Sequence, residues 1–198
     1  AAAPRARRGQ LGSRSTNRPH RGGVRHGAVI ASASGVASPD ASATVDRAEA
    51  IGVIRAAAKG QSSGVGSADV VAAIEALAST SGSAAPRSLV EGSYILVFSS
   101  AIAWLPFADG YMPTREVMSF SFEGARRMEL KVDTLPFLPS IDIVGEDCSY
   151  DEAASMISYR IKGKESSSTW RVVYADDEVL AAESSVTGLN IVRRIPSS

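Results

Sequence analysis

The chain has 198 residues with 21 basic and 21 acidic side chains, so its formal net charge is zero. The charges are unevenly spread, because seven arginines precede Asp40, the first acidic residue, and the remainder holds 14 basic side chains against 21 acidic ones. An acidic domain repels polyphosphate, so nucleic acid is not the expected partner of this part of the chain. No apolar run reaches the roughly 20 residues that a membrane-spanning helix needs.

The N-terminal segment has the composition of an organelle-targeting peptide. It is rich in Arg and Ser and contains no acidic residue before Asp40. Its glycines and prolines interrupt the amphipathic helix that a mitochondrial presequence would form, which favours a plastid. We therefore predict a chloroplast transit peptide over residues 1–31 and a linker over 32–43. The alternative is a basic arm that binds nucleic acid.

Two helices are predicted over residues 44–79. The first spans 44–59, with an acidic early turn and Gly60 after its last turn. The second begins near Ser67 and precedes a linker rich in Ser, Gly, Ala and Pro. Apolar residues recur at helical spacing in both: Ala48, Ile51, Ile54 and Ala58 in the first, and Val70, Val71, Ile74 and Leu77 in the second.

From Leu89 onward the apolar period changes from helical to alternating. Alternation with period two indicates strands with one buried and one wet face, and glycine-containing turns separate the runs. About eight antiparallel strands predict a closed barrel or a sandwich, and we favour a barrel over residues 89–196. The clearest runs are Tyr94 to Phe98, Met118 to Phe122, Met128 to Val132, Ile157 to Ile161 and Trp170 to Tyr174.

Three short stretches resemble the plastid lipid-associated protein (fibrillin) family. Residues 89–100, LVEGSYILVFSS, are similar to its first strand. Residues 170–178, WRVVYADDE, resemble its late strand ending in Tyr, any residue and Asp, and residues 188–194, GLNIVRR, resemble its closing strand. The family often has two arginines after the acidic turn, where this chain has Val179-Leu-Ala-Ala-Glu183. A head group bound by those arginines in relatives is therefore not expected to bind here in the same way.

The resemblance implies a mainly β fold, an antiparallel lipocalin-like barrel of about eight strands preceded by two α-helices. It also implies a protein that binds or organises prenylquinones, carotenoids or other lipids in the chloroplast, in the stroma or at thylakoids or plastoglobules. The alternative is a scaffold or accessory protein with a filled barrel that docks on a plastid enzyme or thylakoid complex.

Catalytic residues are scarce in this sequence. Both histidines, His20 and His26, lie in the predicted transit peptide, and Cys148 is the single cysteine. Without them the domain lacks the bases of Ser-His-Asp and Cys-His chemistry and the usual transition-metal ligands. The acidic residues around Cys148 offer oxygen ligands for a hard cation, but their place in a turn fits a solvated loop equally well. We expect no enzyme, cofactor or metal site.

Three groups of residues are candidates for the function. Strand aromatics are expected to line an apolar pocket or to fill the barrel core. A loop around Pro106 is expected either to contact a lipid surface or cover the barrel mouth, or to plug the barrel. A glycine before an aromatic, with a late arginine, closes one end in lipocalin-like barrels. The first group is Tyr94, Phe98, Phe120, Phe122, Trp170 and Tyr174; the second is Ile102, Trp104, Leu105 and Phe107; the third is Gly92 with Arg193 or Arg194.

Overall fold

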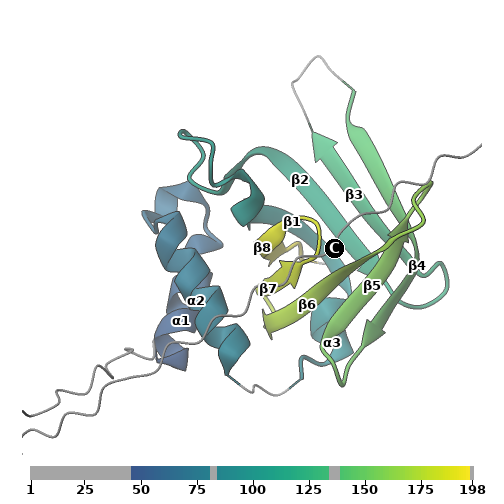
Figure 1. Cartoon of the computed structure of the whole chain (residues 1–198), viewed down its shortest axis with the longest axis horizontal. Helices are drawn as coiled ribbons and strands as arrows, with labels where there is room; N and C mark the ends of the chain where they lie inside the picture. Colours follow the sequence, from purple (N-terminus) through teal and green to yellow (C-terminus); the bar gives the residue numbers. More distant parts are fainter. Residues whose placement is uncertain (1–45, 81–83, 134–138, 197–198) are drawn as a thin grey trace, which may run out of the picture. The chain divides into compact units, whose positions relative to one another are not determined.

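A computed structural model describes residues 46–80, 84–133 and 139–196. The predicted transit peptide, 1–31, and linker, 32–43, lie outside the described residues. The structure confirms the predicted fold class, a mainly β chain with a closed antiparallel barrel of eight strands (Figure 1). Each strand pairs with its neighbours in sequence, and β1 closes the ring on β8. The strands are β1 (Gly92–Ser99), β2 (Tyr111–Ser121), β3 (Arg127–Asp133), β4 (Ile141–Asp151), β5 (Met156–Ile161), β6 (Ser167–Ala175), β7 (Val179–Ser184) and β8 (Gly188–Arg194).

Within the described residues, three α-helices precede the barrel. Helix α1 (Arg47–Ala57) begins after Asp46, whose side chain accepts a hydrogen bond from the Ala48 amide at 3.2 Å. A 3₁₀ turn (Gln61–Ser63) leads to α2 (Ser67–Ser79), and the short helix α3 (Arg87–Val90), which the periodicity did not predict, precedes β1.

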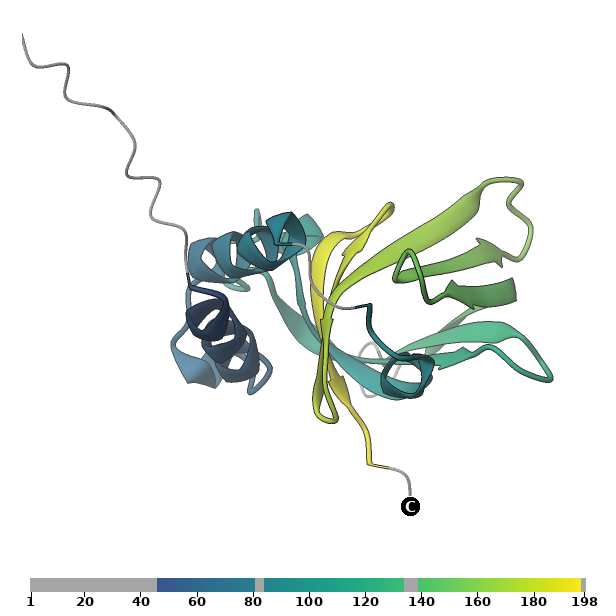
Figure 2. The same ribbon diagram turned by 90° about the horizontal axis from the view of Figure 1, so that it is seen from below.

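The apolar residues form two separate clusters. One fills the barrel, and the other lies between the α1–α2 pair and the outer face of β7, β8 and β1. Figures 1 and 2 show the two helices beside that part of the barrel. The outer cluster includes Ile54 of α1, Ile74 and Leu77 of α2, and Ile191 of β8. An ion pair of 2.9 Å between Arg55 and Asp176 fastens α1 to the turn between β6 and β7. The amphipathic faces of the helices thus cover one side of the barrel.

Bulges in β1, β4 and β6 change which face a side chain occupies, and two of them concern the predicted aromatics. The register shifts between Leu96 and Phe98 in β1, and between Val172 and Tyr174 in β6. An extra residue in a strand sends the following side chain to the opposite face. Simple alternation placed Phe98 and Tyr174 inside the barrel, and that placement was wrong: both belong to the outer cluster beside the helices.

Candidate functional site

The two ends of the barrel differ in construction. Successive strands run in opposite directions, so connections 122–126, 152–155 and 176–178 lie with α3 at one end, here called the α3 end. Connections 100–110, 162–166 and 185–187 lie at the other end, with the first residue of β4. We call this second end the apolar end, for the residues described below.

The α3 end is closed by Arg194. Its guanidinium lies 4.9 Å from the centre of the Tyr94 ring and donates hydrogen bonds to the Leu89 and Glu91 carbonyls at 2.6 and 3.0 Å and to the Tyr94 hydroxyl at 2.8 Å. Arg194 therefore joins β8, β1 and the segment that carries α3. Of the two arginines left open by the sequence, Arg194 has this role, and Arg193 is exposed.

Gly92 leaves the space that this arrangement needs. Its φ of +139° is one that side chains rarely adopt, and a Cβ there would lie 2.8 Å from Nη1 of Arg194. Burial raises the pKa of the Tyr94 phenol to about 12, although Arg194 acts in the opposite direction. The Gly-x-Tyr pair and the late arginine thus lie in direct contact at the α3 end.

Aromatic rings in mutual contact fill the barrel on the side of the α3 end. The Phe120 ring lies 6.3 Å from Tyr94, 6.4 Å from Phe122 and 5.8 Å from Trp170 between ring centroids. All four side chains are buried. Four of the six aromatics predicted to face inward therefore pack on one another, as a core rather than as the wall of an empty pocket.

At the apolar end, four large hydrophobic side chains project into solvent. Trp104 is 76% exposed and Phe107 65%, both in the β1–β2 connection; Val186 is 59% exposed in the β7–β8 turn, and Ile141 is 53% exposed at the start of β4. These four are the exposed large hydrophobic residues of the described chain, and the topology brings all of them to one end. The loop therefore does not plug the barrel, and its Ile102 and Leu105 are half-buried.

The β1–β2 loop is held in place although its tip is exposed. Asp109 accepts a hydrogen bond from the Ser67 amide at 3.1 Å, and the Gln61 side chain donates to the Phe107 carbonyl at 3.1 Å. Tyr111, at the base of the loop, donates to the Val65 carbonyl at 2.7 Å. These bonds tie the loop to the start of α2, so Trp104 and Phe107 are presented outward by an anchored segment.

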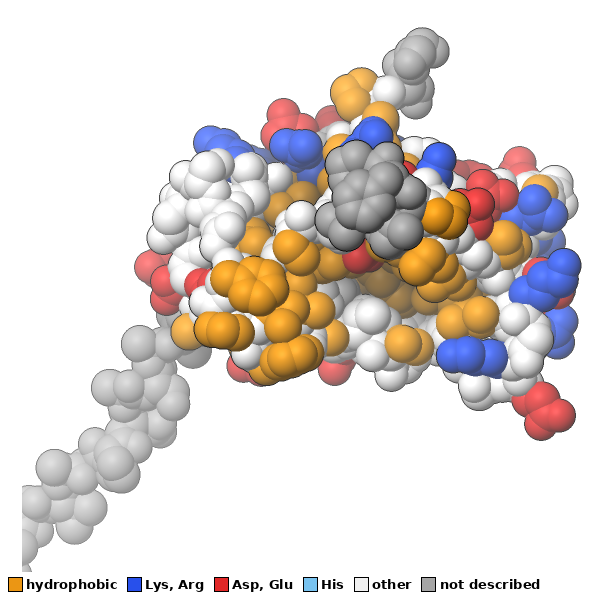
Figure 3. All heavy atoms as spheres, turned by 90° about the horizontal axis from the view of Figure 1, so that it is seen from above, with side chains coloured by type: hydrophobic (Ala, Val, Ile, Leu, Met, Phe, Trp, Pro, Cys, Tyr) orange, Lys and Arg blue, Asp and Glu red, His pale blue; other side chains and the backbone are white. Residues whose placement is uncertain are grey.

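The barrel interior is accessible at the apolar end. Leu130, Val132 and Ile143 share the inner face of β3 and β4 with buried Met128, as their register shows, yet all three are only half-buried. Ile161, on the inner face of β5, is also half-buried. Figure 3 looks onto this end and shows a hollow bordered by hydrophobic side chains. Solvent thus reaches inward-facing apolar groups here, whereas the side near α3 is packed shut.

Sequence reasoning missed Glu116, which lies on this inner face. It pairs directly with Leu96 of β1 and Val132 of β3, and it is two residues from buried Met118. The alternation Met118, Phe120, Phe122, continued backward by two residues, would have placed it inside. It was missed because β2 begins at Tyr111, well before the run that the sequence pattern identified.

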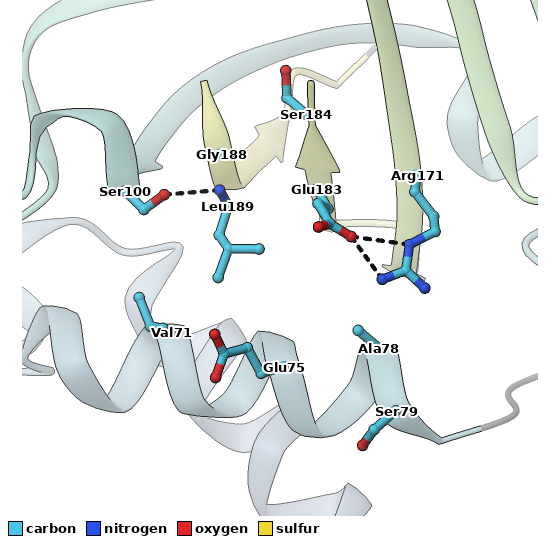
Figure 4. A pocket seen from close by; sticks show the side chains of 10 residues that line it. All are labelled: Val71, Glu75, Ala78, Ser79, Ser100, Arg171, Glu183, Ser184, Gly188 and Leu189. Atoms are coloured by element: carbon cyan, nitrogen blue, oxygen red, sulfur yellow. Dashed lines mark hydrogen bonds and ion pairs between the residues drawn. The ribbon is translucent and has the colours of Figure 1, made fainter. Parts of the chain in front are cut away.

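A separate cleft of about 640 Å³ opens outside the barrel, between α2 and strands β6 to β8 (Figure 4). Glu75 and Val71 of α2 face it from one side, and Leu189 faces it from the other. On the barrel side its charged groups are paired, because Arg171 donates to Glu183 at 2.6 and 3.0 Å. The cleft lies where α2 packs against the barrel, and apolar, polar and charged residues line it. Among these described residues no set of unpaired polar groups converges, so the cleft does not have the features of a ligand site.

The described residues contain little that suggests catalysis or metal binding. Burial raises the pKa of Cys148 to about 12, so its thiol stays protonated and unreactive. Near it, Asp147 pairs with Arg160 at 2.8 Å and Glu152 accepts from the Arg87 amide at 3.1 Å. In the described parts of the chain no three His, Cys, Asp or Glu side chains are grouped to hold a metal ion. No helix there is long and apolar enough to cross a membrane.

The fold and site define a class: a closed eight-stranded antiparallel barrel with one sealed end and one apolar, accessible end. Comparisons with protein-family models, with curated proteins and with solved structures find no match for this chain.

Proposed function

We propose that this chain is a non-enzymatic lipid-associated protein, which binds or organises apolar molecules at a lipid surface through its apolar end. The observation that carries the proposal is the gathering of Trp104, Phe107, Ile141 and Val186 at one end of the barrel. Single exposed apolar residues are ordinary on protein surfaces, but a group on one face indicates a contact site. The type of lipid follows from the resemblance to plastid lipid-associated proteins: prenylquinones, carotenoids or similar molecules at thylakoids or plastoglobules.

Energetics favour a lipid surface as the partner of this end. Moving a large apolar side chain out of water is worth about 1.5–3 kcal/mol, so insertion of Trp104 and Phe107 supplies several kcal/mol. Because Ser67 and Gln61 already anchor their loop, little ordering entropy opposes insertion. The acidic balance of the chain beyond Asp40 gives no attraction to anionic lipid. We therefore expect binding that is hydrophobic and insensitive to salt.

A scaffold that docks on a plastid protein is the second candidate. The aromatic packing around Phe120 favours it, because a barrel filled near α3 leaves room for a ligand only at the other end. In that case the four exposed side chains would be the docking surface for a protein instead of a lipid.

Vesicle flotation tests the proposal. The chain is mixed with phosphatidylcholine vesicles, and its bound fraction is compared with that of the double variant Trp104→Ser, Phe107→Ser. We expect at least a tenfold loss of binding in the variant, with no change between low and high salt for the wild type. The control is Val117→Ser, on the outer wall of β2, which should bind as the wild type does. Absence of wild-type binding would reject the lipid-surface function and favour the scaffold.

A further inference from the structure

Glu116 is a carboxyl group set into an apolar wall. Its inner-face neighbours across the ladder are Leu96 and Val132, and Met118 follows it on the same face of β2. In the described part of the chain, the carboxyl group of Glu116 has neither an ion-pair partner nor a hydrogen-bond partner. A half-buried carboxyl without a partner costs free energy that a structural role would offset with a cation or a donor.

The surroundings of Glu116 set what it can bind. Burial raises the pKa of its carboxyl, and no nearby charge contributes to that change. The charged side chains of the flanking strand positions, Arg115 and Lys131, alternate with it and therefore lie on the outer face. A ligand group beside Glu116 would meet its carboxyl between the hydrocarbon side chains of Leu96 and Val132, with no cation to neutralise a second negative charge.

We propose that Glu116 anchors the polar head of the ligand that enters the apolar end, and that this ligand is an uncharged lipid bearing a hydroxyl donor. The inference rests on the proposed function, because it names the chemical class of molecule bound at that same end. The hydroxyl donates to the Glu116 carboxylate, while the chain contacts Leu130, Val132, Ile143 and Ile161. Anionic lipids such as fatty acids and phosphates are disfavoured, since like charges would be brought together in a poorly solvated passage.

One carboxyl group without a second catalytic group nearby fits ligand binding better than catalysis. General acid–base chemistry on a bound lipid needs a second group that exchanges the proton or holds the reacting atom. The neighbouring inner-face side chains of the adjoining strands are hydrocarbon, so Glu116 binds and orients a head group without a catalytic partner.

Calorimetric titration of the whole chain tests the anchor with three probes of equal chain length: dodecanol, dodecyl methyl ether and dodecanoate. The ether keeps the oxygen and removes the donor. We expect the wild type to prefer dodecanol over the ether by about tenfold or more, as a hydrogen bond to a charged group predicts. Dodecanoate should bind more weakly than dodecanol. In Glu116→Leu the preference for the alcohol should disappear and dodecanoate should gain affinity.

The matched control is Glu129→Leu, which makes the same side-chain change at an exposed position on β3. It should keep the wild-type preference. Glu116→Gln retains the shape of the side chain and an acceptor oxygen, so it should keep part of the preference for dodecanol over the ether. Retained binding in this variant would show that a substitution at this position leaves the site folded. An unchanged alcohol preference in Glu116→Leu would overturn the proposed role of Glu116, and so would a failure of all three probes to bind. Vesicle flotation separates the two proposals. If the chain floats with vesicles but gives either of these results, the role of Glu116 is rejected and the lipid-surface function stands.

Discussion

The two ends of this barrel are formed by the same strands but differ in packing, because one is closed and the other is accessible to solvent. At the α3 end, one arginine bonds to the backbone of the α3 segment and lies over Tyr94, and aromatic rings fill the space behind it. The turns of that end are acidic, with Asp176, Asp177 and Glu178 in one of them. At the apolar end, Trp104 and Phe107 face solvent, and the inner wall along β3, β4 and β5 is only half-buried. We therefore expect the packing near the α3 end to contribute more to the free energy of unfolding than the packing at the apolar end, where large apolar groups are exposed.

We expect the largest change in the free energy of unfolding from a substitution in the interior near the α3 end, compared with one in the interior at the apolar end. Phe120→Ala removes a buried ring that contacts Tyr94, Phe122 and Trp170, and should lower the free energy of unfolding by about 3–5 kcal/mol. Ile143→Ala, on the inner wall of the apolar end, should cost under about 1.5 kcal/mol, because that side chain is already partly hydrated. Denaturant unfolding measures both. Equal losses would mean that the interior is packed alike at both ends.

Removing the Arg194 guanidinium should cause the next largest loss of stability. Arg194→Met leaves the Leu89 and Glu91 carbonyls and the Tyr94 hydroxyl without this donor, and should cost about 2–3 kcal/mol. Arg193→Met changes the adjacent exposed arginine in the same way and should stay within about 0.5 kcal/mol. The difference is read from thermal or denaturant melts. If the two variants lost stability equally, the assignment of the closure to Arg194 would be wrong.

The smallest effect concerns pH at the apolar end. Burial raises the folded pKa of Glu116 above its ordinary value of 4.5, so the native state holds this proton more tightly than the unfolded chain does. Its contribution to stability is therefore complete below that ordinary value and is lost as pH rises through the folded pKa. Glu116→Gln removes this dependence and should become more stable than the wild type toward pH 7, with no difference near pH 3. Parallel melts at the two pH values test this, and a wild type that is the more stable at pH 7 would point to a cationic partner for Glu116.

Much of the barrel could be predicted from the sequence, because period-two alternation directly reports a strand with one buried face. Tyr94, Phe120 and Trp170 face inward as the pattern predicted. Phe98 and Tyr174 do not, since a bulge adds one residue and is not visible in a pattern of apolar positions.

The site was less predictable. The pattern around Pro106 did not decide between an exposed loop and a buried plug, because that depends on Ser67 and Gln61, more than 35 residues away, which tie the loop to α2. The α3 helix was missed because four residues are too few to show a helical period. The alternating pattern could have placed Glu116 on the inner face, because it lies two residues before a run that the sequence identified. It was not considered there because charged residues are rarely found on a buried face.

Fluorescence quenching of Trp104 by vesicles with brominated acyl chains shows whether the apolar end enters a lipid surface. Trp104 is exposed at that end, whereas Trp170, the other tryptophan, is buried in the core. Strong quenching in the wild type, lost in Trp104→Phe while that variant still floats with vesicles, is the result that the account predicts. Bound protein whose Trp104 emission stays unquenched would contradict it, because lipid would then contact another face of the barrel.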